Sequence, residues 1–228
     1  MVYLTGDTHR NFKHVVSFCR RMETTTDDVL VILGDAGINY YDEEDWLLKI
    51  KLRELPISLL CIHGNHEKRP EACGYSEREW RGGKVYWEPE FPNLLFAKDG
   101  EVYELAGKRC MAIGGAYSVD KPVRIAQGYG WWPDEQPSSE IKARVERRLE
   151  TEGWQMDVIL SHTCPRKYEP VEVFLKSIDQ SGVDKATENW LDSIEDRLDY
   201  RLWFCGHFHV NKTIDRLRFM ANDFYFLE

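Results

Sequence analysis

The sequence contains no run of 18 apolar residues, no pair of cysteines in a CxxC arrangement and no excess of positive charge. The first absence argues against a transmembrane helix, and the residues after Met1 lack the basic segment of a signal peptide, so we expect a cytoplasmic protein without membrane contact. The formal net charge of −9 disfavours an extended nucleic-acid footprint, which needs a basic face. The six scattered cysteines are expected to be reduced thiols, and those in apolar runs (Cys61, Cys110 and Cys205) to be buried.

What is present suits one globular domain. The chain has 228 residues, of which 43% are apolar and 13% aromatic, enough for a substantial core. No internal repeat, low-complexity tract or linker divides it. We therefore predict a single domain over residues 1–228, whose oligomeric state the sequence leaves open.

The first sixty-odd residues alternate between strand and helix patterns. Apolar runs at 2–5, 29–33 and 57–62 predict buried strands, and helical spacing predicts helices over 11–21 and 46–55. This alternation is typical of the α/β class, in which ligands gather beyond the carboxyl ends of parallel strands.

The rest of the chain predicts a mixture of strands, helices and two irregular segments. Short strands are expected at 93–97, 101–105, 109–113, 157–160 and 202–204, helices over 137–151 and 187–198, and a closing hairpin over 213–227 with its turn at 221–223. Residues 117–137 and 165–184 show no clear period, and we expect long ordered loops there on the substrate side of the molecule.

Polar side chains gather in five short segments, and each follows an apolar run that predicts a strand. Because parallel strands end at one edge of a sheet, we expect these segments to converge. Carboxylate, imidazole and amide groups without a thiolate suit first-row metals such as Mn, Fe, Co, Ni or Zn. The seven groups expected to bind metal are Asp7, His9, Asp35, Asn65, His162, His207 and His209. Seven donors exceed the needs of one ion, so two ions sharing a carboxylate are predicted.

The order of these motifs resembles the calcineurin-like metallophosphoesterase superfamily. The motifs are Asp7-x-His9, Gly34-Asp35, Gly64-Asn65-His66-Glu67, His162 and Gly206-His207-x-His209. They bracket residues 6–209, and the complete set is far more specific than any one part. The resemblance implies a four-layer α/β/β/α sandwich of two mixed sheets around a dinuclear metal centre, with manganese the first choice of ion. It also assigns Asp7, His9 and His209 to the first metal, Asn65, His162 and His207 to the second, and Asp35 to both.

The activity that the resemblance implies is hydrolysis of a phosphate ester by a metal-bridging hydroxide, which makes the bridging Asp35 part of the catalytic apparatus. His66 is placed to protonate the leaving oxygen or to stabilise its charge. Glu67 is expected to begin a helix, with the orientation of a neighbouring group as the alternative. We expect a small phosphorylated substrate, with Arg10, Asn65, Tyr117 and Arg124 as candidate binding residues.

The sequence departs from the protein serine/threonine phosphatases of this superfamily. Those enzymes carry an aspartate and an arginine shortly after the second glycine–aspartate motif, where this chain has Ile38 and Asn39. A protein-phosphatase function is therefore disfavoured. A phosphodiesterase or nuclease acting on nucleotides or short nucleic acid stays open, and stacking on Trp131 and Trp132 would favour it. A third alternative is a metal-binding scaffold without activity, although the complete ligand set and His66 argue against it.

Overall fold

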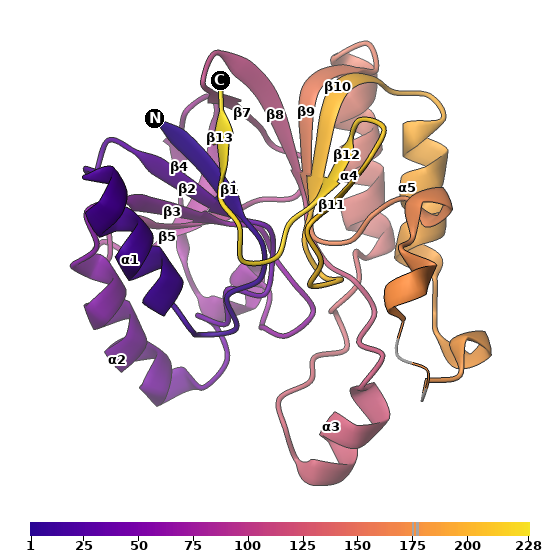
Figure 1. Ribbon diagram of the computed structural model, residues 1–228, viewed down its shortest axis with the longest axis horizontal. Helices are drawn as coiled ribbons and strands as arrows, with labels where there is room; N and C mark the ends of the chain where they lie inside the picture. Colours follow the sequence, from indigo (N-terminus) through magenta and orange to yellow (C-terminus); the bar gives the residue numbers. More distant parts are fainter. Residues whose placement is uncertain (175, 177) are drawn as a thin grey trace.

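The computed structural model describes residues 1–174, 176 and 178–228, and of Asp42 only the backbone. Two mixed β-sheets lie face to face in the middle of the molecule (Figure 1). Helices α1 (Lys13–Met22) and α2 (Asp42–Arg53) cover one outer face. Helices α4 (Ser139–Thr151) and α5 (Ala186–Glu195) cover the other, and the short α3 (Lys121–Gln127) projects away from both sheets.

The first sheet has seven strands in the order β13-β1-β2-β3-β6-β5-β4. Their bounds are β1 Val2–Thr5, β2 Val29–Ile32, β3 Ser58–Cys61, β4 Ser76–Trp80, β5 Gly83–Trp87, β6 Leu94–Ala97 and β13 Tyr225–Leu227. Strands β1, β2, β3 and β6 are parallel, and the remaining pairings are antiparallel. The pairing of β13 with β1 brings the two ends of the chain together (Figure 1).

The second sheet has six strands in the order β11-β12-β10-β9-β8-β7. Their bounds are β7 Val102–Leu105, β8 Lys108–Ile113, β9 Gln155–Ser161, β10 Asp199–Cys205, β11 Lys212–Ile214 and β12 Leu217–Phe219. Strands β8, β9, β10 and β12 are parallel, and β7 and β11 close the two edges as antiparallel strands.

Three hydrophobic cores separate the four layers. Strand residues alternate between faces, so Val31 packs against the second sheet while its neighbours Leu30 and Ile32 pack against α1 and α2. On the other side of the molecule, Val145 of α4 and Leu191 of α5 pack with the outer face of the second sheet. The predicted α/β/β/α sandwich of two mixed sheets is confirmed.

Strand register places the polar segments at a common edge. In the first sheet Thr5 pairs with Ile32, and Ile32 with Cys61, so the three strands end level with one another. In the second sheet Phe204 pairs with Leu160 in the same way. The loops that follow these strands therefore begin side by side.

Three local predictions were wrong. The chain from 121 to 127 is helix α3 rather than loop, because Pro122 stands in its first turn and Gly128 ends it in the left-handed conformation. The C-terminal hairpin turns between β11 and β12, and residues 221–223 instead lead across to the first sheet, where β13 pairs with β1. Helix α1 begins at Lys13, two residues after the predicted start at Asn11.

The second irregular segment, 165–184, contains three short 3-10 helices, Arg166–Tyr168, Val171–Val173 and Gln180–Gly182, and its residues 175 and 177 lie outside the described part of the chain. Another 3-10 helix spans Pro70–Cys73. The six cysteines are free thiols, and all except Cys73 are buried. None of the helices in the described residues combines the length and apolar character needed to cross a bilayer.

Candidate metal centre

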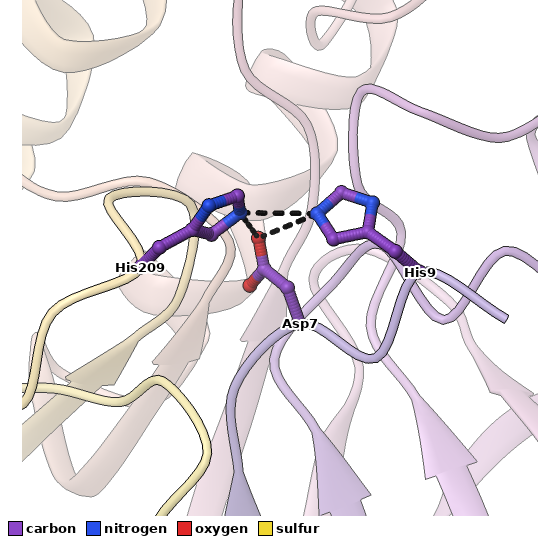
Figure 2. A group of neighbouring side chains, drawn as sticks. All are labelled: Asp7, His9 and His209. Carbon is purple, nitrogen blue, oxygen red and sulfur yellow. Dashed lines mark hydrogen bonds and ion pairs between the residues drawn. The ribbon is translucent and has the colours of Figure 1, made fainter. Parts of the chain in front are cut away.

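The loop after β1 and the loop after β10 bring three predicted ligands together (Figure 2). His209 Nε2 lies 3.0 Å from Asp7 Oδ2 and 3.0 Å from His9 Nε2, and His9 Nε2 lies 3.7 Å from the same carboxylate oxygen. The other oxygen of Asp7 accepts a hydrogen bond from the backbone N–H of His207 at 3.0 Å, which holds Oδ2 toward the two rings. These three side chains are close enough to share one cation.

The electrostatics of this cluster favour a negatively charged carboxylate. Burial opposes ionisation of Asp7, but the hydrogen bond from His209 and the charges of His162, His209 and His9 outweigh it and lower the pKa of Asp7 to about 2. The same hydrogen bond raises the pKa of His209.

A second cluster lies beside the first and is linked to it by Asp35. Asn65 Oδ1 lies 2.8 Å from His162 Nε2 and 3.0 Å from His207 Nδ1. Asp35 Oδ2 lies 3.7 Å from His162 Nε2 and 3.8 Å from His9 Nε2, so one carboxylate oxygen reaches both clusters. The structure thus brings all seven predicted ligands together, while their role in metal binding stays a prediction.

The hydrogen bonds around His162 show that these residues fit a cation. His162 Nδ1 lies 2.8 Å from the carbonyl oxygen of Leu33, which can only accept, so the proton of the neutral ring is assigned to Nδ1 and Nε2 presents a lone pair. The amide nitrogen of Asn65 donates to Ser118 Oγ at 2.9 Å, which turns Asn65 Oδ1 toward His162. Two acceptors therefore face each other at 2.8 Å. A metal ion coordinated by both would relieve this repulsion, and a backbone carbonyl on the opposite nitrogen is the usual partner of a metal-binding histidine.

The backbone at four of the candidate ligands adopts an unusual conformation. The φ angles of His9, Asp35, His207 and His209 are 42°, 49°, 64° and 51°, in the left-handed region that residues with a Cβ seldom adopt. Such conformations cost free energy and persist mainly where a site requires them. Gly34 has φ 96°, and a Cβ there would overlap the ring of His162, so the close approach of the two loops requires glycine at this position.

Glu67 ties two of the ligand loops together and does not begin a helix. Its carboxylate is 2% exposed, and it accepts backbone hydrogen bonds from Gly37 at 2.8 Å and from Gly64 at 3.1 Å. Burial and the charge of Asp35 raise the pKa of Glu67 to about 8, against the effect of these hydrogen bonds. The expectation that Glu67 orients a neighbouring group agrees with these contacts.

His66 stands at the edge of the centre, where its backbone N–H donates to Asp35 Oδ1 at 2.7 Å. The guanidinium of Arg124 contacts Nδ1 of the ring, so the neutral ring is assigned its proton on Nε2. Asp120 Oδ1 lies 3.8 Å from that Nε2 atom. Burial lowers the pKa of His66, and although Asp35 opposes this effect, the charge of Arg124 adds to it. A neutral ring with a proton on Nε2 is therefore favoured.

The other predicted substrate-binding residues lie in different surroundings. Tyr117 lines the cavity beside the centre, together with His66. Arg10 instead pairs with Asp45 and donates to the carbonyl oxygen of Gly37 at 2.6 Å, so its predicted contact with phosphate has no support in the geometry. Arg124 is buried and contacts His66, which makes a direct contact with substrate less favourable than a contact through that ring.

The two tryptophans do not line this cavity. Trp131 Nε1 donates to Glu135 at 2.8 Å, and the ring of Trp132 packs edge-on against Tyr40, with centroids 5.2 Å apart. Packing within the 117–137 segment accounts for both, and base stacking on them has no support in the geometry.

Three residues that the structure places at the centre were absent from the predicted ligand and catalytic sets. Asp120 approaches His66, Ser118 orients the amide of Asn65, and Glu188 lines the cavity. None belongs to a short motif. Only Ser118 carried a signal, because it follows β8 as the other polar groups follow their strands.

Comparisons with known proteins place these clusters in a family. A family model described as calcineurin-like phosphoesterase matches residues 1–211, which include all five polar segments. Phosphopantetheinyl hydrolase from Mycobacterium tuberculosis is similar in structure, with 17% identity over 96% of this chain and 87% of that one and a TM-score of 0.47. A protein of unknown function from Aquifex aeolicus has 14% identity over 88% of this chain and 87% of its own, with a TM-score of 0.36. A comparison with curated protein sequences finds no match.

Proposed function

Because this chain belongs to the calcineurin-like phosphoesterase family, as its motifs predicted, we propose that it hydrolyses small phosphate esters with two divalent or trivalent metal ions, manganese being the first choice. The observation that carries the proposal is the opposition of acceptor atoms at the carboxyl edge of the sheets. Seven donors converge there, of which His9 and His209 are exposed and the others buried or half-buried, and His162 Nε2 faces Asn65 Oδ1 with no proton assigned between them.

The ligand assignment follows the two clusters. Asp7, His9 and His209 would hold one ion, Asn65, His162 and His207 the other, and Asp35, which lies close to His9 and His162, would contribute to both. When bound, two ions supply positive charge that polarises a phosphate and lowers the pKa of water.

The chain's own contribution to bond cleavage would come from His66. The contact of Arg124 with Nδ1 leaves the ring proton on Nε2, and His66 lines the cavity that adjoins the metal ligands. From there Nε2–H can donate to the oxygen of a departing alcohol. Asp120 faces the same nitrogen and would stabilise a positive charge on the ring. Asp120 would thus serve as the carboxylate partner of His66 in a chain that lacks the aspartate of the protein phosphatases at 38.

Hydrolysis by metal-reconstituted protein tests the proposal. The protein is treated with a chelator, dialysed, and titrated with Mn²⁺ in a calorimeter, where we expect two ions per chain. The loaded protein is then given p-nitrophenyl phosphate and bis(p-nitrophenyl) phosphate, whose relative rates decide between monoester and diester hydrolysis. Binding of two ions with hydrolysis of neither compound would support the inactive scaffold. Failure to bind Mn²⁺, Zn²⁺ or Fe²⁺ would reject the metal centre itself.

A further inference from the structure

A cavity of about 480 Å³ adjoins the candidate metal centre. One wall consists of the centre itself, with Asp35, Asn65, His66 and the two histidines after β10. An apolar wall comes from Tyr117, Val119, Phe174, Val183 and Phe208, and the lining also includes the polar residues Asp120, Gln180, Asp184, Lys185 and Glu188. A phosphate placed at the metal ligands would therefore direct its ester group into this space, whose volume is in the range of small-molecule sites.

The apolar wall is held in place by aromatic packing. Phe208, between His207 and His209 in the chain, stacks with Phe174 at a centroid separation of 6.2 Å and an interplanar angle of 14°. Its edge contacts Phe219 of β12 with centroids 5.7 Å apart. Both Phe174 and Phe208 remain half-buried, so part of each ring faces the cavity. An apolar ligand group gains free energy by covering such surface, about 25 cal/mol per Å².

The carboxylate of Glu188, which lines the cavity, has a hydrogen-bond partner on only one of its two oxygens. Glu188 of α5 is 3% exposed, and its Oε1 accepts a hydrogen bond from Thr163 Oγ1 at 2.8 Å. Its Oε2 is buried, and no described residue donates to it. Burying an unpaired carboxylate oxygen is costly, so a donor on the cavity's occupant would stabilise the site. Burial raises the pKa of Glu188, and such a donor would favour its ionised form.

We propose, on the basis of the proposed function, that the alcohol portion of the substrate is an apolar chain or ring carrying one hydrogen-bond donor. The apolar body lies against Phe174 and Phe208, and the donor, a hydroxyl, amide N–H or ammonium group, binds Glu188 Oε2. Glu188 and Phe174 are then residues that determine specificity and take no part in bond cleavage.

Binding and turnover of a homologous series test the proposal with the metal-loaded protein. Methyl-, butyl- and hexylphosphonate, which the enzyme cannot cleave at the P–C bond, are compared by calorimetry with 6-aminohexyl- and 6-hydroxyhexylphosphonate. Turnover is measured on n-alkyl phosphates or, if the enzyme cleaves diesters, on n-alkyl p-nitrophenyl phosphates. We expect affinity and kcat/KM to rise at least 10-fold from methyl to hexyl, and a further increase of about 5-fold or more for at least one terminal donor, the size of a single hydrogen bond.

Two variants separate the parts of the site. Phe174→Ala is expected to remove most of the chain-length effect and Glu188→Gln most of the preference for a terminal donor, with each variant keeping the effect that the other removes. Phe226→Ala, an exposed phenylalanine on β13, is the matched control and should change neither. Equal affinity across the wild-type series, with p-nitrophenyl phosphate still hydrolysed, would overturn this inference and leave the proposed function intact. Lack of hydrolysis of every ester would instead overturn the proposed function.

Discussion

His162 Nε2 lies 2.8 Å from the side-chain oxygen of Asn65, although the carbonyl oxygen of Leu33 accepts from the other ring nitrogen and Ser118 Oγ accepts from the amide nitrogen of Asn65. Two lone pairs held together in a buried place destabilise the fold unless a cation joins them. The left-handed backbone at four of the candidate ligands adds a further cost. A metal ion bound between them, as proposed above, would offset this cost.

We therefore expect Mn²⁺ to raise the melting temperature of chelator-treated protein in a concentration-dependent manner. An ion that binds only the folded state adds about 2.7 kcal/mol when its concentration is 100 times its Kd. Asp35→Asn removes the charge that reaches both clusters, so it should abolish most of this rise and all turnover. Asp27→Asn, an exposed substitution outside the centre, should behave as wild type in differential scanning calorimetry. An unchanged Mn²⁺ response in the Asp35 variant would remove Asp35 from the centre.

His66→Ala is expected to keep both metal ions and to lose turnover by about 10²- to 10⁴-fold, the usual contribution of a general acid. The loss should be smallest for p-nitrophenyl esters, whose leaving group needs little protonation, and larger for alkyl esters. Metal content is measured by calorimetric titration, and His14→Ala on α1 serves as the matched control. Equal loss for good and poor leaving groups would exclude proton donation by His66.

The positions of the candidate ligands at the strand ends were predictable because they follow from strand register. Once β1, β2 and β3 are parallel and end level, Asp7, Asp35 and Asn65 have to emerge at one edge. The partners of His66 were not predictable in this way. Arg124 lies 58 residues further along the chain, and no spacing rule relates the two.

The boundaries of α3 and the path of the last strand were likewise not predictable from the sequence. Pro122 and Gly128 do mark the ends of α3. The helix is short, however, and the tryptophans and glycines that follow it show no period, so the whole segment was predicted as a loop. The sequence of β13 indicates a strand without indicating its sheet. Its pairing with β1 depends on the free edge that the fold leaves there.

Arg124→Gln is expected to lower kcat by about 10-fold or more with little change in KM, because it removes the group that contacts His66 Nδ1 and not a metal ligand. If Arg124 acts through His66, the double variant with His66→Ala should be no slower than His66→Ala alone. The single variant should also show the steeper dependence of rate on leaving-group pKa that His66→Ala shows. Arg147→Gln, exposed on α4, is the control. Additive losses in the double variant would mean that Arg124 acts independently of His66.

Glu67→Gln tests the tie between the two ligand loops. Glutamine has the same shape, but only its oxygen can accept, so its amide group would face the backbone N–H of either Gly37 or Gly64. We expect a loss of about 1–3 kcal/mol in the free energy of unfolding, the cost of an unpaired buried donor. Mn²⁺ affinity should fall about 10- to 100-fold, as for other residues that orient metal ligands. Glu90→Gln, an exposed change of the same kind, should leave both urea denaturation and calorimetric Kd unaltered. If Glu67→Gln loses stability but binds Mn²⁺ as tightly as wild type, Glu67 supports the fold without positioning Asp35 and Asn65.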